Sequence, residues 1–138
     1  MIATPDCSGI KIIAEQTGEW DRTKGQNLMT NWLSKGMQFD AVVSNNDEMA
    51  IGALQAMKSA GVDTKKAIVS GIDATQDALA SMKSGDLKVT VFQDAAGQGK
   101  GAVDAAVALA AGKPVEKKVY IPFQLVTPAN MDQFMKKN

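Results

Sequence analysis

Polar side chains that follow short apolar runs are the best candidates for chemistry in this sequence. Asn46, Asp73 and Gln93 each come one or two residues after such a run, and Trp20 lies in the polar segment 17–22 (TGEWDR). Amides do not titrate and a carboxylate is normally ionised near neutral pH, so this set is poorly suited to acid–base catalysis. A hydroxyl group satisfies amides and carboxylates alike, and an indole plane can cover the apolar face of a sugar ring. The four residues therefore predict a binding site for a polyol.

Each of these residues also has a purely structural interpretation. Asn46 suits a turn, Asp73 suits the cap of a helix that starts at Ala74, and Trp20 suits packing in a core or a lid. Asp47 is expected to cap the helix that it opens, because a carboxylate stabilises the free N–H groups at that end. Taken singly, none of these positions is specific for a ligand.

The composition argues against most catalytic classes and against nucleic acid as a partner. The chain of 138 residues has no His and a single Cys, Cys7. A Ser-His-Asp triad and a CxxC redox pair are therefore excluded, and the usual zinc ligand is missing. Lys plus Arg number 15 and Asp plus Glu number 15, so no basic footprint for nucleic acid is expected.

Two further patterns do not predict a cofactor or a metal. The glycines of segment 97–101 (GQGKG) lack the spacing of nucleotide-binding loops and are expected to let a helix pack closely. Asp47 and Asp73 would suit Mg²⁺ only beside an acid cluster at the end of the first apolar run, where Glu15 and Glu19 are instead separated by a loop. We expect neither a cofactor nor a metal site.

Glycines divide the sequence into units of similar length. Four of them follow helical stretches, where a left-handed residue ends a helix without steric penalty: Gly36, Gly61, Gly85 and Gly112. The apolar runs between and around them predict strands at 9–14, 39–44, 67–72, 88–92 and 118–127, the last broken by Pro122. Helical periodicity fills the intervals, and the alternation is typical of a parallel sheet with helices on both faces.

Several phrases of the sequence resemble the sugar-binding periplasmic binding proteins of the ribose, galactose and inositol type. The phrases are GIKIIAEQTGEWDR at 9–22, NNDEMAIGAL at 45–54, VSGIDA at 69–74, DLKVTVFQ at 86–93 and YIPFQLVT at 120–127. The resemblance covers nearly the whole chain and implies the C-terminal lobe of a two-lobe protein. We therefore expect a single domain over residues 1–138, a flavodoxin-like three-layer α/β sandwich with strand order 2-1-3-4-5.

The resemblance also implies roles for single residues. Trp20 corresponds to an aromatic wall of the sugar site, and Asn46, Asp73 and Gln93 correspond to hydrogen-bonding groups. These are the positions that the strand-end argument selects, since ligands of such sheets bind beyond the carboxyl ends of the strands. Residues 47–49 correspond to the structural opening of a helix.

The function implied is non-catalytic binding of a monosaccharide or cyclic polyol as the solute-binding component of an ABC importer. The expected partners are the sugar, the missing N-terminal lobe and the membrane subunits of the importer, with the parent protein in the periplasm. One alternative is the effector-sensing domain of a LacI-type repressor, which shares the fold and the site. Another is an enzyme or signalling domain on the same fold, which the lack of His and of an acid cluster disfavours.

The N-terminal segment departs from the family pattern. Residues 1–8 (MIATPDCS) lack the pattern expected of a signal peptide, and they stand where the resemblance implies a helix beginning with a sugar-binding Arg. We expect an apolar face near Ile10, Ile12 and Ile13 to be left uncovered. A homodimer that buries this face, or that exchanges residues 119–138 between copies, is the expected consequence.

Overall fold

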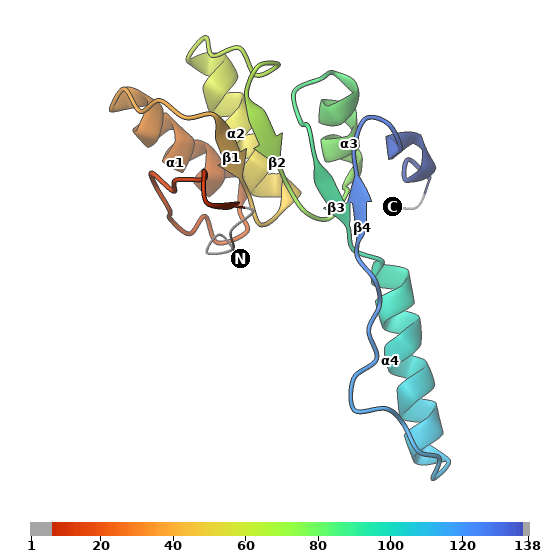
Figure 1. The fold of residues 1–138 in the computed structure, drawn as a ribbon. Coiled ribbons are helices and arrows are strands. Elements are labelled where there is room, and N and C mark those ends of the chain that lie inside the picture. Colours follow the sequence, from red (N-terminus) through yellow and green to blue (C-terminus); the bar gives the residue numbers. More distant parts are fainter. Residues whose placement is uncertain (1–6, 137–138) are drawn as a thin grey trace.

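A computed structural model describes residues 7–136 of the chain. The larger part of the segment 1–8, expected to replace a family helix, lies outside this range. The elements in chain order (Figure 1) are α1 (Arg22–Ser34), β1 (Ala41–Val43), α2 (Asp47–Ser59), β2 (Ile68–Ser70), α3 (Gln76–Lys83), β3 (Thr90–Phe92), α4 (Ala95–Ala110), β4 (Gln124–Val126) and the 3-10 turn η2 (Met131–Gln133). No helix within the described range is long and apolar enough to cross a membrane.

The ends of the helices follow from local sequence. The side chains that cap them accept a backbone N–H of the first turn, and they belong to Asp21, Asn46, Thr75 and Asp94. The expected cap at Asp47 is therefore wrong, because Asn46 has the extended backbone of a cap (φ −151°) and Asp47 is already helical. Thr75 caps α3, so Asp73 does not. All four glycines expected at helix ends are left-handed, with φ between 67° and 85°.

The strands form a short sheet whose pairing differs from the expected order. β1 and β2 are parallel, with Ala41 opposite Ile68, and β3 and β4 are antiparallel, with Phe92 opposite Gln124. A parallel bridge between Ser70 and Val89 joins the two pairs. The expected order 2-1-3-4-5 puts the predicted strand at 9–14 between the predicted strands at 39–44 and 67–72. This order is not found, because the latter two correspond to β1 and β2, which pair directly with each other.

The predicted strand at 9–14 is not formed, because Gly9 lies in a turn and residues 10–14 have no regular secondary structure. A strand needs a neighbour for its backbone groups, and in the described residues no strand pairs with this segment, although the outer edge of β1 is open. Ile10, Ile12 and Ile13 are 59%, 54% and 48% exposed. The three isoleucines are therefore exposed as expected, but on a segment that is not paired into the sheet.

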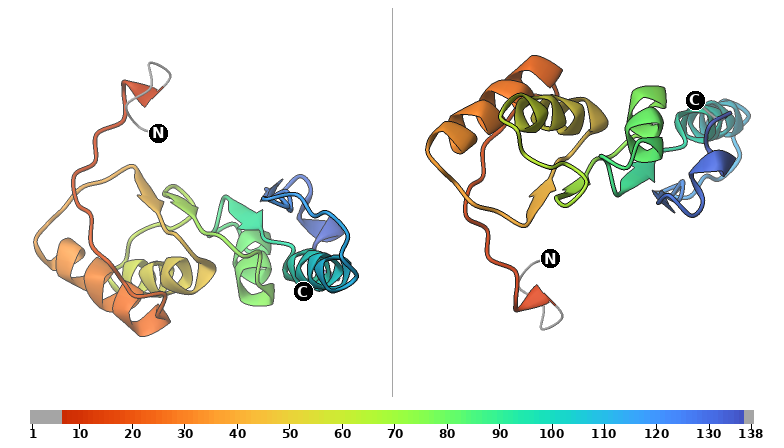
Figure 2. Two further views of the ribbon diagram at one scale, coloured as in Figure 1. Left: turned by 90° about the horizontal axis from the view of Figure 1, so that it is seen from below. Right: turned by 90° about the horizontal axis from the view of Figure 1, so that it is seen from above.

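Helices α1, α2 and α3 all lie on one face of the sheet (Figure 2). Their apolar faces meet Val69 in a core that includes Met29, Leu54, Met57 and Leu79. The opposite face carries exposed apolar side chains, such as Val43 and Ile68. The α/β class with parallel strands is confirmed, and among the described residues the helices α1, α2 and α3 cover one face of the sheet.

Candidate functional site

The carboxyl ends of the strands bring the four predicted site residues to one edge of the sheet. Asn46 comes shortly after β1, Asp73 shortly after β2, and Gln93 directly after β3. Trp20 lies in the loop before α1, and its carbonyl oxygen accepts a hydrogen bond of 3.1 Å from the Asn46 amide. Gln93 Nε2 donates to Asp73 Oδ1 at 2.7 Å. The structure therefore arranges the four residues as two contacting pairs.

Asn46 both caps a helix and anchors the loop that carries Trp20. Its Oδ1 accepts the backbone N–H of Met49 at 3.0 Å while its Nδ2 holds the Trp20 carbonyl. Glu19 and Trp20 have left-handed backbones, with φ of 50° and 63°, and Trp20 is 65% exposed. A non-glycine residue adopts this conformation at a cost of about 1–2 kcal/mol. The Asn46 amide thus fixes a strained loop that presents an open aromatic face.

Asp73 occupies a second strained position. Its φ is 119°, and its backbone N–H donates to the Val91 carbonyl at 2.8 Å. Burial raises the pKa of Asp73; the hydrogen bond from Gln93 opposes this, and the charge of Glu48 adds to it. Because the Gln93 amide donates through Nε2, its carbonyl oxygen is directed away from the carboxylate. The pair can therefore offer oxygen acceptors to a ligand's hydroxyl groups.

Asp47 lies beneath this turn and is fully buried. Its two carboxylate oxygens accept from the Thr90 hydroxyl at 2.7 Å and from the Thr75 N–H at 2.8 Å. Burial raises the pKa of Asp47, and these hydrogen bonds oppose the shift. A side chain at Gly71 would overlap the carboxylate, so this position requires glycine. Asp47 is therefore a buried support of the site, with its carboxylate directed away from the helix end that it was expected to cap.

Arg22 is a charged residue at this edge that the sequence analysis did not select. Its guanidinium binds Glu48 through two hydrogen bonds of 2.7 and 2.8 Å and contacts Asp77 at 2.7 Å. The hydrogen bonds to Glu48 and then Asp77 raise the pKa of Arg22 further above its usual range. The one signal for it in the sequence was its place at the end of the TGEWDR segment. Its two partners are 26 and 55 residues away along the chain.

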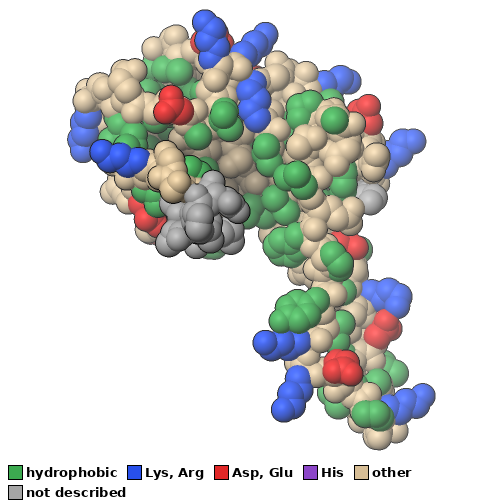
Figure 3. Space-filling model, in the orientation of Figure 1, with side chains coloured by type: hydrophobic (Ala, Val, Ile, Leu, Met, Phe, Trp, Pro, Cys, Tyr) green, Lys and Arg blue, Asp and Glu red, His purple; other side chains and the backbone are tan. Residues whose placement is uncertain are grey.

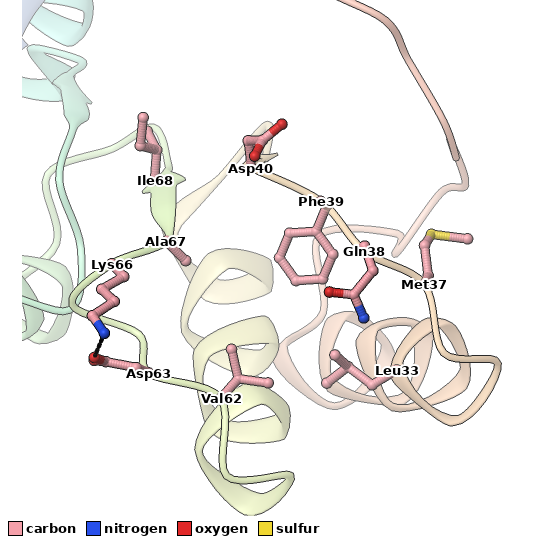
Figure 4. A pocket seen from close by; sticks show the side chains of 10 residues that line it. All are labelled: Leu33, Met37, Gln38, Phe39, Asp40, Val62, Asp63, Lys66, Ala67 and Ile68. Carbon is pink, nitrogen blue, oxygen red and sulfur yellow. Dashed lines mark ion pairs between the residues drawn. The ribbon is translucent and has the colours of Figure 1, made fainter.

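A hollow of the described surface lies at the opposite end of the strands (Figure 4). It measures about 520 Å³ and lies before β1 and β2, where Phe39, Val62 and Leu33 form an apolar wall. Asp63 and Lys66 form an exposed ion pair of 3.7 Å at its rim. Because ligands of open α/β sheets bind at the carboxyl ends of the strands, this hollow is not the candidate site. Within residues 7–136, no group of three His, Cys, Asp or Glu side chains could hold a metal ion.

Comparison with known proteins identifies the family. The periplasmic binding protein domain matches residues 2–114. A protein of Rhizobium meliloti that is assigned as rhizopine-binding is 59% identical over all 138 residues, which make up 45% of its length. The ribose import binding protein of Bacillus subtilis is 41% identical over 118 residues, 86% of this chain and 38% of that protein.

A solved structure shares the fold as well as the sequence. The ABC transporter solute-binding protein from Bacillus halodurans, crystallised with bound myo-inositol, is 48% identical and superposes with a TM-score of 0.87. The match covers 94% of this chain and 45% of that one. The chain thus spans less than half the length of the relatives it matches, and it belongs to the periplasmic binding protein domain family.

Proposed function

We propose that this chain supplies half of the binding site for a monosaccharide or cyclic polyol in the solute-binding component of an ABC importer. The observation that carries the proposal is the Asp73–Gln93 pair, held at 2.7 Å on a strained turn at the same sheet edge as the exposed Trp20. The ligands named for the relatives, ribose and myo-inositol, are ring compounds with several hydroxyl groups. Their chemistry fits this set of side chains.

Each site residue then has one role. The Trp20 ring covers the C–H face of the ligand, and Asp73 and Gln93 bind adjacent hydroxyl groups. Asn46 holds the Trp20 loop and contacts the ligand through its remaining acceptor capacity. Arg22, Glu48 and Asp77 form the charged border of the site.

The proposed activity is binding without catalysis. The relatives named above are binding proteins, and the candidate site contains neither His nor Cys. Sugar bound between this lobe and a second lobe would shift the protein from an open to a closed conformation. The closed conformation is the one that the importer recognises. The proposal places the parent protein in the periplasm, with the importer's membrane subunits as partners. The repressor alternative is less well supported, because two of the relatives described here are named as an import binding protein and an ABC transporter solute-binding protein.

A full-length chimera tests the proposal. In it, this chain replaces the matching 138 residues of the Rhizobium meliloti relative. Calorimetry with inositols, pentoses and hexoses should detect micromolar binding of at least one compound. The 138-residue chain alone should bind it only at about millimolar concentration, because losing half of about 8 kcal/mol leaves about 4 kcal/mol.

Variants of the chimera link binding to the site. Asp73→Asn should weaken binding about 10-fold, because a mismatched polar group costs about 1–3 kcal/mol. Asp63→Asn, at the opposite end of the strands, is the matched control and should bind normally. A folded chimera that binds none of these compounds, or an Asp73→Asn variant of unchanged affinity, would refute the proposal.

A further inference from the structure

The C-terminal residues 124–136 fold back onto the part of the sheet that leads to Gln93. Strand β4 pairs with β3, with Gln124 opposite Phe92, and the chain then turns and forms η2. Figures 1 and 3 show this segment on the body of the molecule, beside α3, whereas α4 projects away from the body. The end of the described chain therefore lies next to the strand that enters the candidate site.

One aromatic side chain anchors this segment in the core. Phe134 is 2% exposed, and its ring centroid lies 5.3 Å from that of Phe92, with the two ring planes tilted by 50°. Aromatic rings at this distance and tilt attract each other beyond the effect of burying their surfaces. Phe92 is also buried, and it immediately precedes Gln93. The ring contact therefore acts on the residue next to a proposed ligand group.

Two hydrogen bonds hold the rest of the segment in place. Asn130 Oδ1 accepts the N–H of Thr127 at 2.8 Å, which closes the turn after β4. The Met135 carbonyl accepts a bond of 3.2 Å from Gln76 Nε2, on the first residue of α3. The start of α3 comes directly after the turn that carries Asp73. The C-terminal segment is thus attached close to both members of the Asp73–Gln93 pair.

Strand geometry connects the ring contact with Gln93. Successive side chains of a strand point to opposite faces, so burial of Phe92 in the core fixes the direction in which the next side chain leaves the sheet. That next side chain is Gln93, whose Nε2 meets Asp73 Oδ1 at 2.7 Å. Hydrogen bonds of this kind are normally about 2.7–3.2 Å long, so a displacement of about 1 Å at Phe92 is enough to break this one.

We propose that Phe134 is a positioning residue of the candidate site. Its contact with Phe92 keeps the Gln93 amide in reach of its carboxylate partner, and residues 127–136 act as a brace for the pair. The proposal rests on the ligand role proposed above for Asp73 and Gln93. Removing the Phe134 ring should loosen the pair without changing any atom of the pair itself.

The pKa of Asp73 in the 138-residue chain provides the first test, because it needs no ligand. The hydrogen bond from Gln93 lowers this pKa, whereas burial, the largest effect, and the charge of Glu48 raise it. Phe134→Ala should therefore raise the pKa of Asp73, measured by carbon-13 NMR of its carboxyl group during an acid titration. Glu48 and Asp47, acidic groups that interact with Asp73, are the same in the variant and in wild type.

Met29→Ala is the matched control for a general loss of stability. Met29 is buried in α1, which lies on the other side of the molecule from β3 (Figure 1), so this variant should leave the pKa of Asp73 unchanged. Phe134→Leu keeps an apolar side chain and should raise this pKa less than Phe134→Ala, and it replaces the alanine variant if that does not fold. An unchanged Asp73 pKa in the folded Phe134 variants, or an equal rise in Met29→Ala, would overturn the proposal.

Ligand affinity in the chimera described above provides the second test. Phe134→Ala should weaken binding about 10-fold, because the ligand must then order a pair that is already ordered in wild type. Normal affinity of a folded Phe134→Ala chimera would overturn the positioning role. Failure of the sugar proposal has a different signature: the wild-type chimera then binds none of the compounds, while the pKa of Asp73 still reports whether Phe134 holds the pair.

Discussion

The Asp47 carboxylate accepts a 2.7 Å hydrogen bond from the Thr90 hydroxyl, and both residues are fully buried. The same hydroxyl oxygen accepts the N–H of Ala74 at 3.2 Å, and the second oxygen of Asp47 accepts the N–H of Thr75. Asp73, with its φ of 119°, immediately precedes these two N–H groups. The unusual backbone of a proposed ligand residue is therefore supported by two fully buried side chains.

Removing the Thr90 hydroxyl should destabilise the protein. Thr90→Val keeps the shape of the side chain but leaves a buried carboxylate oxygen of Asp47 and the N–H of Ala74 without this partner, at a cost of about 3 kcal/mol. Thr90→Ser keeps the hydroxyl and loses one methyl group, at about 1 kcal/mol. Urea unfolding of the two variants measures the difference. If Thr90→Ser loses as much stability as Thr90→Val, packing rather than the hydrogen bond holds the turn.

Asp86 predicts how stability depends on pH in the acid range. Burial favours its neutral form, but hydrogen bonds from Lys58, Ser84 and Thr64 outweigh burial and hold the pKa of Asp86 well below its ordinary value of 3.8. When folding lowers the pKa of a carboxyl group, its charged form stabilises the folded protein. This stabilisation is fully present above the pKa that the group has in the unfolded chain, and it is lost as the pH falls through the pKa that the group has in the folded protein. Wild type should therefore lose this contribution below about pH 4.

The variant Asp86→Asn isolates this contribution. It should be about 2 kcal/mol less stable than wild type at pH 7, and the difference should shrink toward pH 2. Asp47 acts in the opposite direction, because burial raises its pKa and acid relieves the cost of its charge. Wild type and the Asp86→Asn variant both contain Asp47, so its effect cancels in the difference between their free energies of unfolding. A difference that stays constant from pH 7 to pH 2 would show that the Asp86 charge does not contribute.

The helices and their ends could be predicted from the sequence because they depend on residues close together in the chain. Gly61 ends α2 with φ 74°, as expected from the sequence, and Met57, Leu79 and Met82 on α2 and α3 lie in the core. The cap of α2 was misplaced by one residue. Asp47 and Asn46 are both good caps by type, and the choice depends on Thr90, which is 43 residues away.

Features that depend on distant partners were not predictable in this way. Segment 9–14 has the composition of a strand, but a strand forms only beside another strand, and composition does not indicate whether one is present. Arg22 was overlooked because Glu48 and Asp77 are remote in sequence. Helical periodicity in the interval before Gly112 predicted α4 correctly but did not reveal that none of its residues is buried.

Trp20 should contribute to ligand binding and little to folding. In the chimera, Trp20→Ala should weaken binding about 10-fold, since ring contacts with a large aromatic contribute about 1–2 kcal/mol. Its Tm should change by less than about 2 °C, because an exposed side chain adds little to the core. Calorimetry and thermal unfolding test the two halves of this prediction. A Trp20→Ala variant with normal affinity, or one that loses its fold, would show that the ring packs and does not bind.

The apolar face around residues 9–14 should make the 138-residue chain self-associate at high concentration. Ile10, Ile12 and Ile13 are about half exposed, and Val43 on the open face of the sheet is 81% exposed. The outer edge of β1 has no strand beside it in the described residues, and an open edge with apolar side chains favours pairing with another chain. A two-fold arrangement needs only one self-complementary patch, so a dimer is the expected species.

Sedimentation from micromolar to millimolar concentration measures this association. The substitution Ile13→Lys should shift the equilibrium toward monomer, because a charge cannot be buried in an apolar interface without a partner. Lys11→Ala is the matched control on the same segment and should leave the dimer intact, since it removes a charge from the interface region rather than adding one. Circular dichroism must show an unchanged α/β spectrum for both variants. A chain that stays monomeric at every concentration, or a dimer that Ile13→Lys does not weaken, would show that residues 9–14 do not form the interface.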